Sequence, residues 1–221
     1  MDWNQDGKKD LIIGDSDGYI YTYINTAADN APLLAAGEKL KVNGNVFGPD
    51  LLKEQFGDTL KYFNRAKPEV VDWNNDSKAD LLVGIEEGYV LLLLNTGAKG
   101  APLFKTITFI KDGDKNLRPG TSLMRVDPRV YDWNADGKKD LLLADEKGNV
   151  HYFENKGTDF NPVFNGSVLL EVDGVPLKGG PRSRLDIVDW NKDGQPDLLY
   201  GSKDENFDAQ LHLYLAATPD K

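Results

Sequence analysis

A nine-residue motif rich in acidic and amide side chains occurs four times in the sequence. Each copy places oxygen-bearing side chains at positions one, three, five and nine, and the copies begin at Asp2, Asp72, Asp132 and Asp189. Hard divalent cations such as calcium bind six to eight oxygen atoms, and alternate residues of a tight loop can all face one centre. The spacing therefore predicts a calcium-binding loop in every copy and up to four bound calcium ions.

The expected ligands are equivalent in the four loops. Side-chain oxygens come from positions one, three, five and nine, and position seven contributes its backbone carbonyl. Glycine at position six allows the positive φ that curls the chain around an ion, so we expect Ser77 to weaken the second site. The predicted metal-site residues are Asp2, Asn4, Asp6, Lys8 and Asp10; Asp72, Asn74, Asp76, Lys78 and Asp80; Asp132, Asn134, Asp136, Lys138 and Asp140; and Asp189, Asn191, Asp193, Gln195 and Asp197.

Three other interpretations of the motif are weaker. An EF-hand needs a glutamate at position twelve and a helix on either side, but Ile13, Val83, Leu143 and Tyr200 occupy that position. Asx-rich turns that close hairpins would explain a single loop, and four copies with the same oxygen positions favour calcium. Magnesium keeps several of its waters and does not require this many protein oxygens.

Short apolar segments flank each loop and predict the strands that position it. Residues 68–73 (PEVVDW) run into the second loop, 80–84 (DLLVG) leave it, and 89–95 (YVLLLLN) follow a glycine-containing turn. A proline-marked segment, 101–110, supplies a fourth strand before the next motif. Four antiparallel strands in a repeat of about 60 residues are typical of a β-propeller blade, so the predicted fold class is an all-β propeller.

The four repeats predict one β-propeller, or a segment of one, over residues 1–221. The first unit has strands two to four, the second and third are complete, and the last has strands one to three. A short helical turn at 49–57 explains the longer first spacing. We expect the open edges of the incomplete first and last blades to be covered by a larger parent chain or by a second copy in a homo-oligomer. The tryptophans, which all occupy motif position two, should pack between units; they are Trp3, Trp73, Trp133 and Trp190.

Composition narrows the classes of partner. The net charge is −10, which disfavours nucleic acid, although the three aspartates in each of the four loops carry more negative charge than this net value. The chain has no cysteine, so neither disulfides nor thiolate metal sites are expected. The longest apolar run, 89–94, is far shorter than the ~20 residues of a membrane-spanning helix, so we expect a strand buried on both faces and no membrane insertion.

No constellation of residues predicts catalysis. His151 and His212 occupy equivalent places on third strands, where other units have Tyr21 and Leu91, so packing is their expected role. Several arginines before the first strands could pair with neighbouring acids or bind a carboxylated ligand, and pairing with the acidic loops is the favoured interpretation. These are Arg65, Arg125, Arg129, Arg182 and Arg184.

The loop and the "DLLxG" segment that follows it resemble the FG-GAP/VCBS-type repeats of secreted and cell-surface proteins and the calcium-binding blades of integrin α-subunits. The resemblance covers essentially the whole chain. It implies a propeller with structural calcium, an extracellular, cell-surface or periplasmic location, and binding of a glycan or protein in adhesion. Similar propellers occur in rhamnogalacturonan lyases, which implies an alternative as a module of a secreted polysaccharide-degrading enzyme. A structural or self-assembling repeat protein is the third hypothesis.

Overall fold

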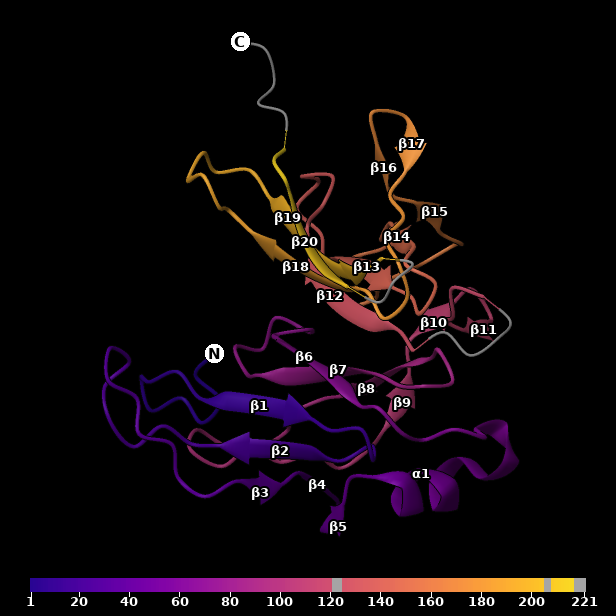
Figure 1. Ribbon diagram of the computed structural model, residues 1–221. Coiled ribbons are helices and arrows are strands. Elements are labelled where there is room, and N and C mark those ends of the chain that lie inside the picture. Colours follow the sequence, from indigo (N-terminus) through magenta and orange to yellow (C-terminus); the bar gives the residue numbers. More distant parts are fainter. Residues whose placement is uncertain (121–124, 205–207, 217–221) are drawn as a thin grey trace.

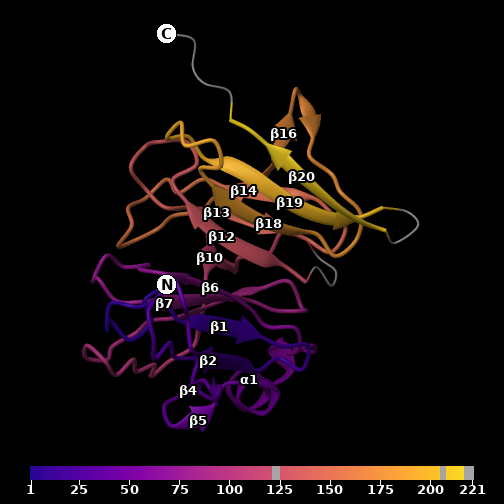
Figure 2. The ribbon, with the colours of Figure 1, turned by 60° about the vertical axis from the view of Figure 1, so that its left-hand side comes forward.

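The computed structural model describes residues 1–120, 125–204 and 208–216, and it consists mainly of antiparallel β-strands (Figure 1). Four principal sheets follow one another along the chain, with three, four, four and three strands. This arrangement confirms the all-β fold class, the four-stranded units and the shortened first and last members. Figure 2 shows the first two units in the lower half of the view and the last two units in the upper half.

Each principal sheet is a simple antiparallel meander, in which every strand pairs with its neighbour in sequence. The strands that follow the loops begin at the last aspartate of the motif in units two to four, because Asp80, Asp140 and Asp197 are paired with the ends of the preceding strands. The bounds are β1 (Leu11–Gly14), β2 (Ile20–Tyr23) and β3 (Glu38–Lys39); β6 (Lys67–Val71), β7 (Asp80–Gly84), β8 (Val90–Leu93) and β9 (Thr108–Phe109); β12 (Asp127–Tyr131), β13 (Asp140–Ala144), β14 (Val150–Phe153) and β15 (Val168–Leu169); and β18 (Arg184–Val188), β19 (Asp197–Lys203) and β20 (Ala209–Tyr214).

Small two-stranded hairpins, which were not predicted from the sequence, follow the fourth strands. They are β4 (Lys41–Val42) with β5 (Asn45–Val46), β10 (Lys111–Asp112) with β11 (Lys115–Asn116), and β16 (Glu171–Val172) with β17 (Val175–Pro176). Asn43 and Gly44 in the first hairpin, and Asp173 and Gly174 in the third, have positive φ. Asn-Gly and Asp-Gly pairs favour such tight turns, so these dipeptides were the available sequence signal.

The described residues contain one α-helix, α1 (Pro49–Phe56), which continues into the 3-10 turn η1 (Gly57–Thr59). It confirms the helical turn expected at 49–57. Pro49 lies in the first turn, where its missing N–H costs nothing, and Leu52 is fully buried. Gln55 Nε2 donates to the carbonyl oxygen of Ile107 at 2.7 Å and so joins the helix to the second unit. In the described part of the chain, no helix is long and apolar enough to cross a membrane.

The hydrophobic core lies between neighbouring sheets. Successive residues of β7 alternate between two clusters: Leu81 and Val83 pack with the first unit, and Leu82 packs with the third. All three side chains have 0% exposure. Leu142 of β13 likewise belongs to a third cluster shared with unit four. Both faces of the inner units are covered, and β8 (VLLL) is apolar along its whole length, as the sequence predicts for the run at 89–94.

The tryptophans of the motif confirm this pattern of packing between units. Trp3 is 4% exposed and Trp73 is 5% exposed, and each belongs to a cluster with the following unit. Trp133 packs against the third cluster. Trp190 is instead 59% exposed, because no sheet of the described chain covers the outer face of unit four.

The first and last sheets each have an uncovered side. In β1, Leu11 and Ile13 are both 41% exposed, whereas the equivalent strand β7 is wholly buried. In β20, Leu211 is 71% exposed. These exposed apolar side chains are the structural counterpart of the incomplete blades expected from the sequence.

Candidate functional sites

The four acidic loops share one hydrogen-bonded conformation. In the second loop, the two carboxylate oxygens of Asp72 accept the N–H groups of Asp76 and Ser77 at 3.0 and 2.8 Å. Asn74 Oδ1 also accepts the Asp76 N–H at 3.1 Å, and Asp76 Oδ1 accepts the Lys78 N–H at 3.0 Å. The other three loops make the same four bonds. The side chains at positions one, three and five are therefore turned inward over a tight loop.

The aspartate at position nine ties the loop to its sheet. Asp80 is fully buried, and its two oxygens accept the N–H groups of Trp73 at 3.0 Å and Asn95 at 2.7 Å. Burial raises the pKa of Asp80 and the nearby Asp76 raises it further, while the backbone N–H groups of Asn95 and Trp73 oppose the rise. Equivalent bonds fix the other three loops. Position nine thus has a structural role in addition to its predicted role as a ligand.

The carboxylates are most closely grouped in the second loop. One oxygen from each of Asp72, Asp76 and Asp80 lies within 4.8 Å of the others, and the described residues contain no second group of this kind. Ser77 adopts φ 64°, so a non-glycine residue does hold the left-handed conformation expected at position six. Oxygen atoms grouped in this way, together with the Asn74 side chain, form a donor set that suits a hard divalent cation.

Two features of the loops were not foreseen from the sequence. Position four is also left-handed, with φ between 57° and 62° in Gln5, Asn75, Ala135 and Lys192. The position-seven lysines lie beside the position-five aspartates, most closely in the third loop, where Lys138 Nζ is 2.8 Å from Asp136 Oδ2. This side-chain hydrogen bond lowers the pKa of Asp136.

In units one to three, a buried asparagine closes the turn that follows the third strand. Asn95 is 5% exposed, and its Oδ1 accepts the N–H groups of Gly97 at 2.9 Å and Leu103 at 3.0 Å. Asn25 and Asn155 make the equivalent bonds. The sequence showed an asparagine-rich turn here, but it did not indicate that one side chain would close the whole turn.

Neighbouring loops are linked along one edge of the molecule. Gln5 Nε2 donates to the Ser77 carbonyl oxygen at 2.6 Å, which joins the first loop to the second. Asn75 Nδ2 donates to Asp159 Oδ2 at 3.0 Å, and Asp159 Oδ1 accepts the Lys139 N–H at 2.7 Å. These bonds couple the positions of the first three units at the edge where the loops lie.

A row of arginines lies at the opposite end of the first strands. Arg125 contacts Glu86 and Glu146 at 2.9 Å each, and it thereby bridges the second and third units. Arg65 lies 3.5 Å from Glu86, and Arg182 lies 4.0 Å from Glu146. The predicted pairing of the arginines with the acidic loops is therefore wrong. These three arginines precede the first strand and the loops follow it, so a five-residue strand of roughly 17 Å separates them. The prediction is also wrong for Arg129 and Arg184, whose acidic partners lie on the first strands.

The first strands carry a second layer of charge. Arg129 of β12 forms ion pairs with three carboxylates, at distances of 3.2 Å to Asp127, 3.3 Å to Asp186 and 3.7 Å to Glu69. Burial raises the pKa of Glu69 to about 7, although Arg129 opposes this rise. Burial also lowers the pKa of Lys67 to about 8, and its Nζ donates to the Arg125 carbonyl oxygen.

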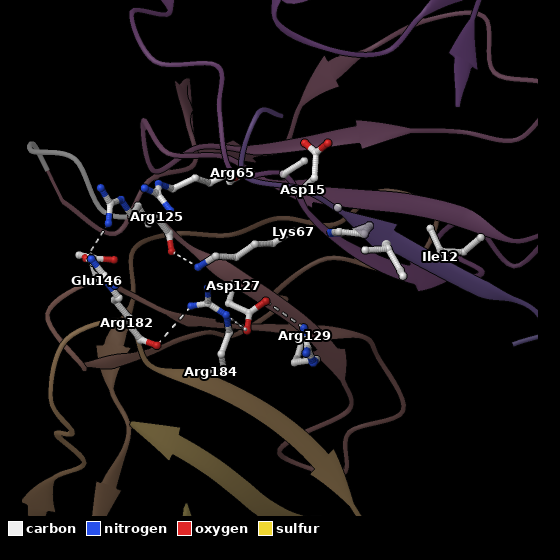
Figure 3. A pocket seen from close by; sticks show the side chains of 15 residues that line it. Ile12, Asp15, Arg65, Lys67, Arg125, Asp127, Arg129, Glu146, Arg182 and Arg184 are labelled. Atoms are coloured by element: carbon white, nitrogen blue, oxygen red, sulfur yellow. Dashed lines mark hydrogen bonds and ion pairs between the residues drawn. The ribbon is translucent and has the colours of Figure 1, made fainter. Parts of the chain in front are cut away.

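These charges surround a cavity of about 430 Å³ between the inner strands, which we call the central cavity. Figure 3 shows Asp127 among Lys67, Arg129 and Arg184. Asp15 and Glu146 also line the space. The cations that line it are Arg65, Lys67, Arg125, Arg129, Arg182 and Arg184.

The two histidines pack within the sheets, as expected. His151 is buried, and its Nε2 lies 3.1 Å from Asp145 Oδ2. Burial opposes ionisation of Asp145, but hydrogen bonds from His151 and Asn149 outweigh it and lower the pKa of this carboxyl group. His212 stacks on Tyr214 with ring centroids 6.1 Å apart. Neither histidine lines the central cavity.

Comparison with known families agrees with the repeat analysis. Residues 132–200 match the FG-GAP-like repeat family, and this segment runs from the third acidic loop into the second strand of unit four. No curated protein matches the chain. The chain therefore carries an FG-GAP-type repeat, a class typical of β-propeller-like modules that are often extracellular.

Proposed function

We propose that this protein is a calcium-stabilised binding module with β-propeller architecture, located outside the cell, on its surface or in the periplasm, that recognises a glycan or a protein. The observation that carries this proposal is the common conformation of the four loops. Each loop turns the same set of oxygen atoms inward, and in the second loop three carboxylates lie within 4.8 Å of one another.

The energetic reason is repulsion between the carboxylates. Two unit charges about 4 Å apart repel by ~1 kcal/mol in bulk water and by more near a protein surface. Asp80 is fully buried, so water screens its charge poorly. A calcium ion would convert this repulsion into attraction, with Asn74 and the Lys78 carbonyl as further ligands. Because the loop geometry forms only on folding, calcium binding and folding should be linked.

Thermal unfolding with and without calcium tests the proposal. We expect excess EGTA to lower the melting temperature of the full chain, and added calcium to restore it. Asp76→Asn should reduce the calcium response, whereas Asp114→Asn, on the exposed turn between β10 and β11, should retain it. An unchanged melting temperature in excess EGTA would overturn the calcium proposal.

The uncovered sides of the first and last sheets suggest a partner. We propose that a longer parent chain or a second copy covers Leu11, Ile13 and Leu211, whose exposure is unusual for strand residues. Light scattering of the purified chain distinguishes these cases, because self-association doubles the mass or forms larger assemblies. A strictly monomeric chain would exclude the second copy and the self-assembling hypothesis.

One observation favours the enzymatic alternative, a polysaccharide-degrading module. Lys67 lines the central cavity and its pKa is lowered to about 8, so a fraction of its amine is unprotonated at mildly alkaline pH. Such an amine could act as the base in eliminative cleavage of an acidic polysaccharide. A rise in ultraviolet absorbance from unsaturated products, and its loss in Lys67→Met, would support a lyase. Binding of the polysaccharide without cleavage would support the binding module.

A further inference from the structure

The floor of the central cavity contains a buried acceptor without a partner. Asp127 is 4% exposed, and its Oδ1 accepts from Arg129 Nη1 at 3.2 Å. Its Oδ2 is buried and has no hydrogen-bond partner in the described structure, since Arg184 Nε lies 4.0 Å away. A buried acceptor without a hydrogen bond typically lowers the stability of the fold by ~1–3 kcal/mol, and by more when it is charged. The presence of such an acceptor here suggests a donor from outside the chain.

The mouth of the cavity presents cations that are only loosely paired. The side chains of Arg65, Arg182 and Arg184 are 41%, 54% and 53% exposed. Their ion pairs run through Nε at distances of 3.5, 4.0 and 4.0 Å. Ion pairs of this length leave the terminal nitrogens of Arg65 and Arg182 available for an incoming anion. Arg184 Nη1 donates to the carbonyl oxygen of Ser183 at 2.8 Å, so its Nη2 is the nitrogen that remains for the ligand.

The charge of the lining favours an anion even though the whole chain has a net charge of −10. Six cations and three acids face the cavity. Three further acids, Glu69, Glu86 and Asp186, lie behind the lining and hold Arg65, Arg125 and Arg129 in place. The guanidinium groups of Arg125 and Arg129, which lie 2.9 to 3.3 Å from carboxylates, are thus oriented before a ligand arrives, and this reduces the entropy lost on binding.

The required ligand carries an anionic group and a hydrogen-bond donor close together. Arginine forks match carboxylates, and a sugar hydroxyl can donate to Asp127 Oδ2. The volume of about 430 Å³ falls within the ~300–1,000 Å³ range of small-ligand sites. The cations of the site are side chains, whereas phosphate sites commonly use backbone N–H groups at a helix N-terminus.

We infer that the central cavity binds a carboxylated sugar. The arginines at the mouth hold the carboxylate of the sugar, and one of its hydroxyl groups donates a hydrogen bond to Asp127. This inference rests on the proposed binding function and specifies the ligand class for it. The carboxylate and ring hydroxyls of a hexuronate unit meet both requirements within one residue, either as a free sugar or at the end of an acidic glycan.

Calorimetric titration of the calcium-loaded full chain provides the first test. The probes are glucuronate and galacturonate, with neutral glucose and inorganic phosphate as comparators. We expect at least one hexuronate to bind about tenfold or more tightly than glucose and phosphate, the loss expected when a charge-assisted hydrogen bond is missing. Equal binding of glucose, tighter binding of phosphate, or no binding of either hexuronate would overturn the inference.

Variants then assign the contacts. Arg184→Gln should weaken hexuronate binding about tenfold or more, while Lys115→Gln, which removes a positive charge from the exposed β10–β11 hairpin, should not. Asp127→Asn keeps one oxygen as an acceptor for Arg129 and replaces the other oxygen with an amide donor, so we expect it to lose hexuronate binding. Unchanged affinity with a lower melting temperature would assign Asp127 to the fold alone and overturn its role in binding.

A glycan array separates failure of this inference from failure of the proposed function. If the array shows binding of neutral glycans only, and Arg184→Gln retains it, the cavity inference fails and the binding module stands. If EGTA leaves the melting temperature unchanged and neither a glycan nor a protein partner binds, the proposed function itself fails. Binding of acidic glycans that Arg184→Gln abolishes supports both.

Discussion

The indole ring of Trp3 stacks on the phenyl ring of Phe104, with ring centroids 5.5 Å apart and an angle of 23° between the ring planes. Trp3 belongs to the first unit and Phe104 to the second. In the next interface, Trp73 and Phe164 are buried in one cluster. Position two of the acidic motif therefore contributes to the packing between units, although the residues on either side of it belong to the loop.

We expect Trp3→Ala to destabilise the protein far more than Trp190→Ala. Truncating a buried aromatic side chain costs ~3–5 kcal/mol, whereas the 59% exposed Trp190 should cost less than ~1 kcal/mol. The free energies of unfolding, measured by urea denaturation in calcium, test this difference. Similar losses in both variants would show that the motif tryptophans act within their own loops.

Asp76 and Asp80 should respond differently to truncation, although both are predicted ligands. Asp80→Ala leaves the buried N–H groups of Trp73 and Asn95 without acceptors, so we expect a loss of ~2–4 kcal/mol with or without calcium. Asp76→Ala should cost less than ~1 kcal/mol in EGTA and should lower calcium affinity. Urea denaturation in both buffers measures these losses, and equal behaviour of the variants would contradict the separate structural role of Asp80.

Ser77→Gly should stabilise the second loop. Ser77 has φ 64°, where a non-glycine residue is strained by about 1 kcal/mol. Relief of this strain should raise the free energy of unfolding by up to ~1 kcal/mol, less the greater chain entropy of glycine when unfolded. Gly137→Ser is the reverse substitution at the equivalent position of the third loop, and it should lower the free energy of unfolding. A loss of stability in Ser77→Gly would show that the serine makes a compensating interaction.

Glu69 should make stability fall as the pH rises from about 4.5 to about 7. Its pKa is raised to about 7 by burial, so the folded protein retains a proton that the unfolded chain has lost in this window. The contribution of this carboxyl group to the free energy of unfolding therefore decreases by ~2–3 kcal/mol across the window. Urea denaturation of Glu69→Gln in saturating calcium should show a correspondingly smaller fall than the exposed control Glu54→Gln. Identical pH profiles would contradict the raised pKa.

Much of the fold and of the loops could be predicted from short-range patterns. The repeat length, the strand segments and the loop oxygens depend on residues that lie within a few positions of each other. The Asn-Gly and Asp-Gly turns of the small hairpins are also short-range patterns. They were not predicted because the residues on either side of them resemble a continuation of the fourth strand. The left-handed residue at position four has no comparable signature, since Gln5, Asn75, Ala135 and Lys192 share no side-chain chemistry.

The partners of the charged residues could not be predicted in this way. Arg125 meets Glu86, 39 positions away, and Arg129 meets Asp186, 57 positions away. These contacts depend on which turns of neighbouring units approach the start of each first strand. The sequence by itself determined the repeated units and the oxygen atoms of their loops, because those follow from local spacing. Only the tertiary structure decided that six cations converge on one cavity with Asp127, whose Oδ2 accepts no hydrogen bond, because that convergence requires three sheets to be packed side by side.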